Sequence, residues 1–287
     1  MIIQAIINGI LFGAVYAMIG IGFSLVWGVM RIVNLAHGSF IMVGAYISFT
    51  LFAVYGLDPF LSVPIVMILL FGVAYCIQRF LINRVVKGPI FITLTFTFGL
   101  QILIANICLL LWKADLRSAK LSYSSAAFFE NGTITIPLVR FGIFISAIVL
   151  TVLFYIFMRK TKVGIAINAT ALNYDGARTV GVDVDSIYAT TFAVSAALAG
   201  AAGALMLPIT SMNPFFGGQI INKAFVVSIL GGLGSTVGAL VGGMTLSLAE
   251  TLGTVFLPSS MQELIGFVFF IAVLAFRPQG FLGKRFY

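Results

Sequence analysis

The chain has 287 residues, of which 61% are hydrophobic and 8% charged, and its mean hydropathy is +1.16. This composition excludes a water-soluble domain, which could not bury so much apolar surface, and it predicts a single membrane domain over residues 1–287. A net charge of +8 would suggest nucleic-acid binding in a soluble protein, but in a membrane protein the basic residues set the topology. We therefore expect the protein to lie in a lipid bilayer and to bind no nucleic acid.

Apolar runs of about 20 residues, the length that crosses a bilayer, predict an all-α transmembrane bundle of eight or nine segments. The expected segments are Ile6–Met30, Phe40–Tyr55, Leu61–Leu81, Ile90–Trp112, Arg140–Phe157, Tyr188–Pro208, Asn222–Leu233, Val237–Phe256 and Met261–Phe276. The seventh is only twelve residues long, and a glycine-rich break, Gly231–Thr236, follows it. This pattern fits a discontinuous helix that lines a pathway and, equally, an ordinary tight turn. Its candidate pathway residues are Gly231, Gly232, Gly234 and Ser235.

Basic residues predict the orientation, because they accumulate on the cytoplasmic side. Eleven of the sixteen fall on one side: Arg31, Arg79, Arg84, Lys87, Arg159, Lys160, Lys162, Arg178, Arg277, Lys284 and Arg285. The remaining five are Lys113, Arg117, Lys120, Arg140 and Lys223. The N-terminus is then outside, the C-terminus is cytoplasmic, and the loop 113–139 faces outward.

The link after the first segment, Arg31–Gly38, holds the only histidine, His37. Polar residues near a membrane usually face the protein interior or a cavity, so Asn34, His37 and Gly38 are candidates for the cytoplasmic end of a pathway. The alternative is a turn whose side chains cap two helix ends. A lone histidine is no catalytic unit, and with two separated cysteines it makes no metal site. We expect neither catalytic residues nor a metal.

A polar segment, 159–187, carries seven charges and lies between two apolar runs. Its composition predicts one helix from Val163 to Val180, ended by Gly181, since glycine tolerates the left-handed conformation after a helix. Surface-lying helices usually carry basic and aromatic residues, whereas this one is rich in alanine. Docking into a groove of a partner protein is therefore favoured over lying on lipid headgroups.

The next run, Phe192–Leu205, consists largely of alanine and glycine. Such a segment packs closely against its neighbours, and sliding against them is a further hypothesis. Glu250 is the only carboxylate placed well inside a segment. Proton coupling and a structural pair with Lys223 are both open to it, and the pair is favoured.

The sequence lacks the lysine-bearing phosphate loop of ATPases, because Gly231–Thr236 has the glycines without the lysine. It also lacks a metalloprotease motif. We therefore expect no enzyme activity and no cofactor on this chain.

Four stretches in order resemble the H-type permease subunits of bacterial branched-chain amino acid ABC importers. They are Gly22–Tyr46, Asn168–Leu205, Gly231–Gly243 and Phe276–Lys284. The resemblance covers nearly the whole chain. It implies that the polar segment docks a helix, Val163–Gly181, into an ATPase subunit. The matching positions are Ala171, Asn173, Asp175, Ala177, Arg178, Gly181 and Val182. Asn168 and Ile165 depart from the family pattern, which often has basic residues there.

The resemblance also implies the partners: an M-type permease, two ATP-binding cassette subunits that hold ATP and Mg, and a periplasmic or lipid-anchored amino-acid-binding protein. The expected function is import of leucine, isoleucine or valine across the bacterial inner membrane. Relatives with the same motifs carry urea or short amides. A second hypothesis is an ion-coupled transporter that uses Glu250 or His37, and a third is an intramembrane enzyme, for which no residue set is found.

Overall fold

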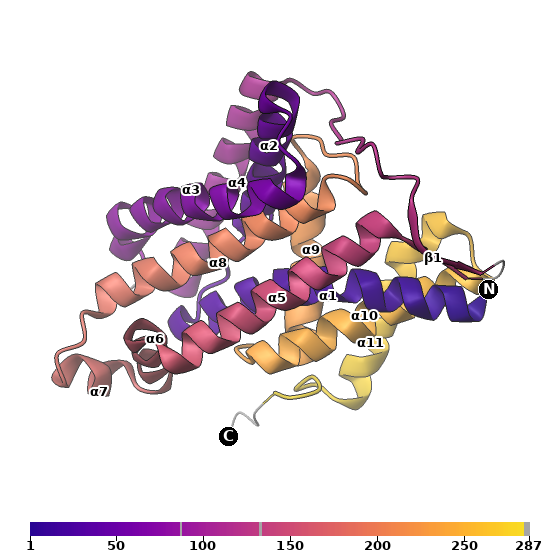
Figure 1. Ribbon diagram of the computed structural model, residues 1–287. Helices are drawn as coiled ribbons and strands as arrows, with labels where there is room; N and C mark the ends of the chain where they lie inside the picture. The colour runs from indigo at the N-terminus through magenta and orange to yellow at the C-terminus, as the bar shows by residue number, and fades with distance from the viewer. Residues whose placement is uncertain (87, 132–133, 284–287) are drawn as a thin grey trace.

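The computed structural model describes residues 1–86, 88–131 and 134–283, which form a helical bundle with one small β-hairpin (Figure 1). The helices are α1 (Ile2–Met30), α2 (His37–Tyr55), α3 (Pro59–Phe80), α4 (Ile90–Trp112), α5 (Leu138–Lys160), α6 (Lys162–Leu172), α7 (Tyr174–Thr179), α8 (Val184–Met206), α9 (Phe216–Gly231), α10 (Thr236–Phe256) and α11 (Gln262–Phe276). Two short 3-10 turns lie at Ile82–Arg84 and Ser259–Met261. Strands β1 (Ala127–Asn131) and β2 (Ile134–Pro137) pair antiparallel.

Within the described residues, eight helical segments are long and apolar enough to cross a membrane. They contain α1, α2, α3, α4, α5, α8, α10 and α11, so the predicted polytopic helical bundle is confirmed. The exception is α9, which has 16 residues and begins at Phe216, six residues before the predicted start. A helix of that length spans about 24 Å at 1.5 Å per residue, which is less than the hydrocarbon core of about 30 Å.

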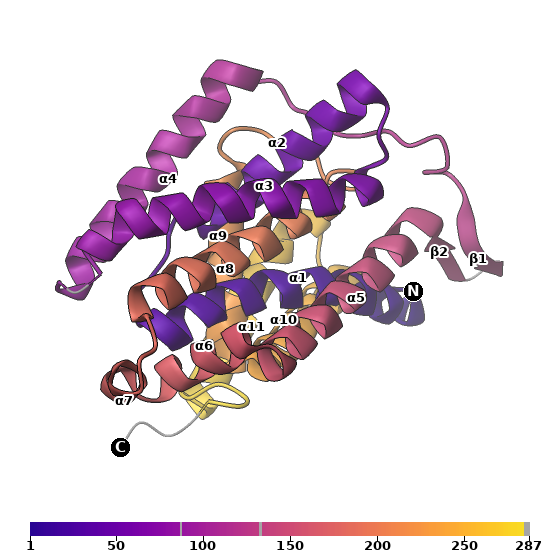
Figure 2. The same cartoon turned by 60° about the vertical axis from the view of Figure 1, so that its left-hand side comes forward.

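Helices α1 and α8 form the centre of the bundle. Of their most apolar stretches, 89% of the residues are buried inside the protein, against 17% for α4 and 6% for α11 at the periphery. Figure 2 shows α1, α3, α5 and α8 running roughly side by side. Small residues make this closeness possible, since a Cβ atom added at Gly203 of α8 would lie 1.9 Å from the carbonyl oxygen of Ile41 in α2. The predicted close packing of the alanine-rich segment is thus confirmed.

The two ends of the bundle differ in what they carry. The N-terminus and the hairpin lie together at one end, where the side chain of Gln4 donates to the Thr135 carbonyl at 2.8 Å and accepts from its N–H at 3.0 Å. Helices α6 and α7 lie at the opposite end (Figure 1). This separation agrees with an outward loop and a polar segment on opposite sides. The direction of the bundle in a membrane stays a prediction, and three of its basic residues, Lys87, Lys284 and Arg285, lie outside the described residues.

Candidate functional site

The polar segment folds as two helices, so the prediction of one continuous helix from Val163 to Val180 is wrong. Helix α6 starts after Thr161, whose hydroxyl oxygen accepts from the Gly164 N–H at 3.0 Å. Asn173 then adopts an extended conformation (φ −152°, ψ 102°) and accepts from the Gly176 N–H at 2.9 Å. An asparagine that caps a following helix competes with continuation of the preceding one. The break therefore originates at Asn173.

Helix α7 ends as predicted. Gly181 has a φ of 86°, in the left-handed region that favours glycine. The N–H of Gly181 donates to the Arg178 carbonyl, and that of Val182 donates to the Ala177 carbonyl, both at 3.1 Å. These bonds satisfy carbonyls that a helix end would leave without partners.

Most of the expected coupling positions lie on the surface at this end. Asn173, Asp175, Arg178 and Gly181 are exposed, Ala171 and Val182 are partly buried, and Ala177 is buried. Two large apolar side chains beside them are also exposed, Leu172 to 80% and Val180 to 78%. The end of the bundle thus presents apolar and charged side chains side by side, as a surface that binds a partner protein does.

The link between α1 and α2 turns back into the bundle. Arg31 ends α1 in the left-handed conformation (φ 52°). His37, at the start of α2, is fully buried, with Nε2 3.1 Å from the Ile19 carbonyl oxygen and Nδ1 3.3 Å from the Ser195 hydroxyl. Since Ile19 lies mid-way along α1, α2 begins deep within the bundle. His37 therefore joins α1 and α8 and does not cap a helix end.

Side chains of the protein surround this link, as the absence of water in a bilayer requires. The hydroxyl of Thr97 in α4 donates to the Val33 carbonyl at 3.0 Å and accepts from the Leu35 N–H at 3.3 Å. Asn34 is buried, and its Oδ1 has no hydrogen-bond partner among the residues that the structure describes. Gly38 lies against Gly217 of α9, where an added Cβ would meet the Gly217 carbonyl oxygen at 2.0 Å.

The break after α9 is a tight turn. Gly232 and Gly234 have φ values of 98° and 82°. The N–H of Ser235 donates to the Gly232 carbonyl, and its hydroxyl accepts from the Gly238 N–H and so caps α10, both at 3.0 Å. Of the two alternatives, the connection itself is the ordinary tight turn. The short length of α9 nevertheless agrees with a discontinuous helix. A role of Gly231–Ser235 in a pathway stays a prediction.

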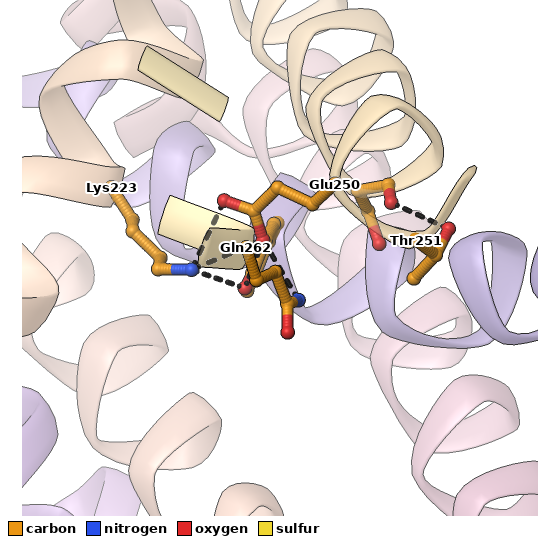
Figure 3. A network of polar contacts seen from close by, with 6 residues as sticks. Lys223, Glu250, Thr251 and Gln262 are labelled. Atoms are coloured by element: carbon orange, nitrogen blue, oxygen red, sulfur yellow. Dashed lines mark hydrogen bonds and ion pairs between the residues drawn. The ribbon is translucent and has the colours of Figure 1, made fainter. Parts of the chain in front are cut away.

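Glu250 lies in a network of polar side chains from four helices (Figure 3). The Lys223 ammonium is 3.0 and 3.1 Å from the two carboxylate oxygens. The Tyr16 hydroxyl donates to the carboxylate at 3.0 Å, and the Gln262 amide donates at 3.2 Å. The expected pairing with Lys223 is confirmed. Three side chains, those of Lys223, Tyr16 and Gln262, thus donate hydrogen bonds to the buried carboxylate.

Lys223 itself lies inside the bundle, with only 17% of its side chain exposed. Its ammonium also donates to the hydroxyl of Tyr16 at 2.8 Å, and Tyr16 lies mid-way along α1. The use of Lys223 as an outward topology signal was therefore wrong. Counting basic residues to predict topology assumes that they lie outside the membrane. Lys223 instead lies inside the bundle, where it is paired with the carboxylate of Glu250.

Several further residues, which were not expected from the sequence, accompany this pair. Tyr16 and Gln262 donate to the same carboxylate, and a cavity of about 90 Å³ opens beside it between α9, α10 and α11. Gln219 and Asn222 line this cavity. Their signal in the sequence was two amides three residues apart next to an apolar run. Within the described part of the chain, no three His, Cys, Asp or Glu side chains come together as metal ligands would.

These features define the class of the protein. Membrane transport proteins typically have three features that are found here. They are span-length helices packed through glycine and alanine, irregular links buried inside the bundle, and a charge pair in the interior. The chain belongs to the family described as the permease component of branched-chain amino acid transport systems, whose model matches residues 5–274.

Several relatives are similar in sequence to this chain along nearly their whole length. The chain is 31% identical to the high-affinity branched-chain amino acid transport system permease protein BraD of Pseudomonas aeruginosa and 30% identical to LivH, the corresponding permease protein of Escherichia coli; both alignments cover 98% of this chain and 96% of the relative. A probable permease protein LivH of Methanocaldococcus jannaschii is 30% identical, over 96% of this chain and 91% of the relative. No solved structure matches the chain. The chain is thus a multi-pass inner-membrane transport subunit and not an enzyme.

Proposed function

We propose that this chain forms part of the translocation pathway of an ATP-driven importer of branched-chain amino acids. The observation that carries the proposal is the family match over residues 5–274. The sequence has no phosphate loop, so the energy has to come from other subunits. The proposed assembly contains an M-type permease, two ATP-binding cassette subunits that hold ATP and Mg, and a binding protein outside the membrane.

Helices α6 and α7 are the proposed coupling element, seated in a groove of an ATPase subunit. The proposed contacts are those of Ala171, Asn173, Asp175, Ala177, Arg178, Gly181 and Val182. The exposed apolar side chains of Leu172 and Val180 support the proposal, because a partner would bury them. In this assembly the α6–α7 end faces the cytoplasm, the N-terminus lies outside and the C-terminus lies in the cytoplasm.

The element is well connected to the bundle, so a movement of α6 and α7 is transmitted to the spans. Asn168 of α6 donates to the Met158 carbonyl at the end of α5 at 3.0 Å. A Cβ atom added at Gly164 would lie 2.5 Å from the Cα atom of Met158. On the other side, Asp183 caps α8 and lies 3.9 Å from Arg79 of α3. A displacement at the ATPase therefore reaches α3, α5 and α8 together.

Assembly and uptake test the proposal separately. The tagged chain, co-expressed with its candidate partners, should co-purify with an ATPase and support ATP-dependent leucine uptake in proteoliposomes. Asp175→Lys and Arg178→Glu should abolish co-purification of the ATPase and leave the fold unchanged. Glu130→Lys in the exposed hairpin is a matched control at the opposite end. If both α7 variants assemble and transport like the unaltered chain, α6–α7 is not the coupling element.

A further inference from the structure

Helix α9 packs against buried parts of α1 and α2 over most of its length. Figure 1 shows it crossing α1 and α8 and not running alongside them. Near its start, Gly217 packs on Gly38 of α2; in its middle, Lys223 donates to Tyr16; and further on, the Ser228 hydroxyl donates to the Gly20 carbonyl at 3.1 Å. All three partners belong to buried parts of spanning helices. The middle of α9 therefore lies inside the bundle, while its last turn meets the C-terminal segment, where the N–H groups of Phe281 and Leu282 donate to the Leu230 and Gly231 carbonyls at 2.7 and 3.0 Å.

One face of α9 is nevertheless both polar and uncovered. Gly218, Gln219 and Asn222 are exposed. On the neighbouring α4, the amide of Gln101 borders the same face, 3.2 Å from where a Cβ atom on Gly218 would lie. Amide side chains without hydrogen-bond partners are strongly disfavoured in hydrocarbon. Polar residues at this depth face a water-filled cavity or another polar group.

The face leads into the cavity of about 90 Å³ beside the Lys223–Glu250 pair. At roughly 10–15 Å³ per water molecule on this measure, the cavity has room for about six to nine water molecules. Its polar side consists of Gln219, Asn222, Lys223, Glu250 and Glu263. Its apolar side consists of Val226, Leu246, Gly266 and Phe267. The lining of the cavity is thus divided into a polar and an apolar side.

We propose that this cavity is a transit site for the zwitterionic amino acid on its way across the membrane. Lys223 and Glu250 neutralise each other, so Glu263 leaves one net negative charge, which attracts the α-ammonium group of the substrate. The amides of Gln219 and Asn222 donate to its carboxylate. The branched side chain packs on Val226, Leu246 and Phe267. The assignment rests on the proposed function and adds the site at which that function recognises its substrate.

The pairing of Lys223 with Glu250 also explains why such a site would release its ligand. The ammonium of Lys223 already donates to the Tyr16 hydroxyl and to both carboxylate oxygens of Glu250. A substrate carboxylate would have to compete with Glu250 for this cation. Binding is therefore weakened by an internal competitor, as transport requires of a site that must also empty.

Access of water to α9 tests the location of the site. In a chain whose two cysteines, Cys76 and Cys108, are replaced, Asn222→Cys should react with a charged, membrane-impermeant thiol reagent in the assembled transporter. Val268→Cys on the exposed outer face of α11 is the control and should stay unreactive in lipid. Saturating leucine with the binding protein should slow the reaction at position 222 at least severalfold. Equal reactivity at positions 222 and 268, or no slowing by leucine, overturns the assignment.

Transport tests the chemistry. Glu263→Gln keeps the shape and removes the charge, and we expect it to lower the rate of ATP-driven leucine uptake about tenfold, as loss of a charge-assisted hydrogen bond would. Glu130→Gln in the hairpin is the charge-matched control and should transport normally. Normal uptake by Glu263→Gln would overturn the transit site while leaving the proposed function intact. Absence of uptake by the unaltered complex would instead reject the proposed function.

Discussion

Two polar regions of this permease hold their charged side chains in place in opposite ways. At one end, Asp175 and Arg178 lie on the exposed helix α7, which is held by a local cap from Asn173 and a glycine stop. In the interior, Lys223 and Glu250 are joined across α9 and α10, and Tyr16 and Gln262 complete the network. The exposed region is stabilised by its own sequence neighbours, the buried one by residues far apart in the chain.

Because of this difference, substitutions in the two regions should affect different properties: partner binding for α7, and the stability of the fold for the interior. Exposed charges gain little from ion pairs in water, so substitutions on α7 should act on partner binding. The side chains of Lys223 and Glu250 are only 17% and 3% exposed, so removal of one partner leaves a largely buried charge without its counter-charge. Substitutions in the interior should therefore unfold the protein before they reveal anything about transport.

The largest effect is expected for Glu250→Leu. It leaves the Lys223 ammonium without its carboxylate partner, and should lower the free energy of unfolding by roughly 3–5 kcal/mol. The double variant Lys223→Met with Glu250→Leu should recover most of this loss, since no charge remains unpaired. Thermal unfolding of the purified protein in detergent measures both. A single variant as stable as the unaltered protein would show that the pair is hydrated.

A somewhat smaller effect is expected for Gly203→Val. The added side chain meets the backbone of Ile41, which cannot move aside as a flexible side chain does, and overpacking costs typically about 1–3 kcal/mol. Gly72→Ala on α3 is the control, because nothing lies within 4 Å of its added Cβ atom; alanine should even stabilise that helix by roughly 0.5–1 kcal/mol. Equal unfolding temperatures for both variants would contradict close packing of α2 on α8.

For the exposed region, Asn173→Ala should cost about 1 kcal/mol, confined to α7, by loss of the cap. Hydrogen exchange of the Tyr174–Thr179 amides should become faster, while exchange in α1 and α8 stays unchanged. Asn173→Asp retains an acceptor oxygen and should exchange like the unaltered chain. Faster exchange throughout the bundle would mean that α7 is part of the interior and not an appendage.

The smallest effect concerns Tyr123, in the loop between α4 and the hairpin, at alkaline pH. Burial, together with a hydrogen bond to Asp58, raises the pKa of Tyr123 well above its usual value near 10. The folded protein keeps this proton at a pH where the unfolded chain loses it. The stabilisation is therefore complete below about pH 10 and declines as the pH rises further. Unfolding measured between about pH 9 and pH 11 should show a shallower decline for Tyr123→Phe than for the unaltered chain.

The spanning helices could be predicted because hydrophobicity over about 20 residues depends on local sequence alone. Three features needed information that such averages discard. The break at Asn173 depends on one side chain capping a helix. The hairpin of β1 and β2 lies in a loop that was judged only by its polarity. The early start of α9 was hidden by Phe216 and the two glycines after it, which resemble a loop.

The interior site could be predicted only in part. The pairing of Glu250 with Lys223 followed from the rule that buried charges have partners. The contributions of Tyr16 and Gln262, and the cavity, depend on α9 crossing α1 steeply, and no periodicity in the sequence specifies a crossing angle. For the same reason His37 was expected near the cytoplasmic end, although the link before it returns to the middle of α1.

The charge pair also imposes an order on synthesis. Lys223 is made 27 residues before Glu250, on a helix too short to remain in the bilayer alone. During translation the ammonium therefore has to wait for its carboxylate, next to the Tyr16 hydroxyl that is already in place. We expect α9 to enter the membrane together with α10, as a helical pair. The step at which this permease is most exposed to misassembly and quality-control proteolysis would then be the interval between these two residues leaving the ribosome.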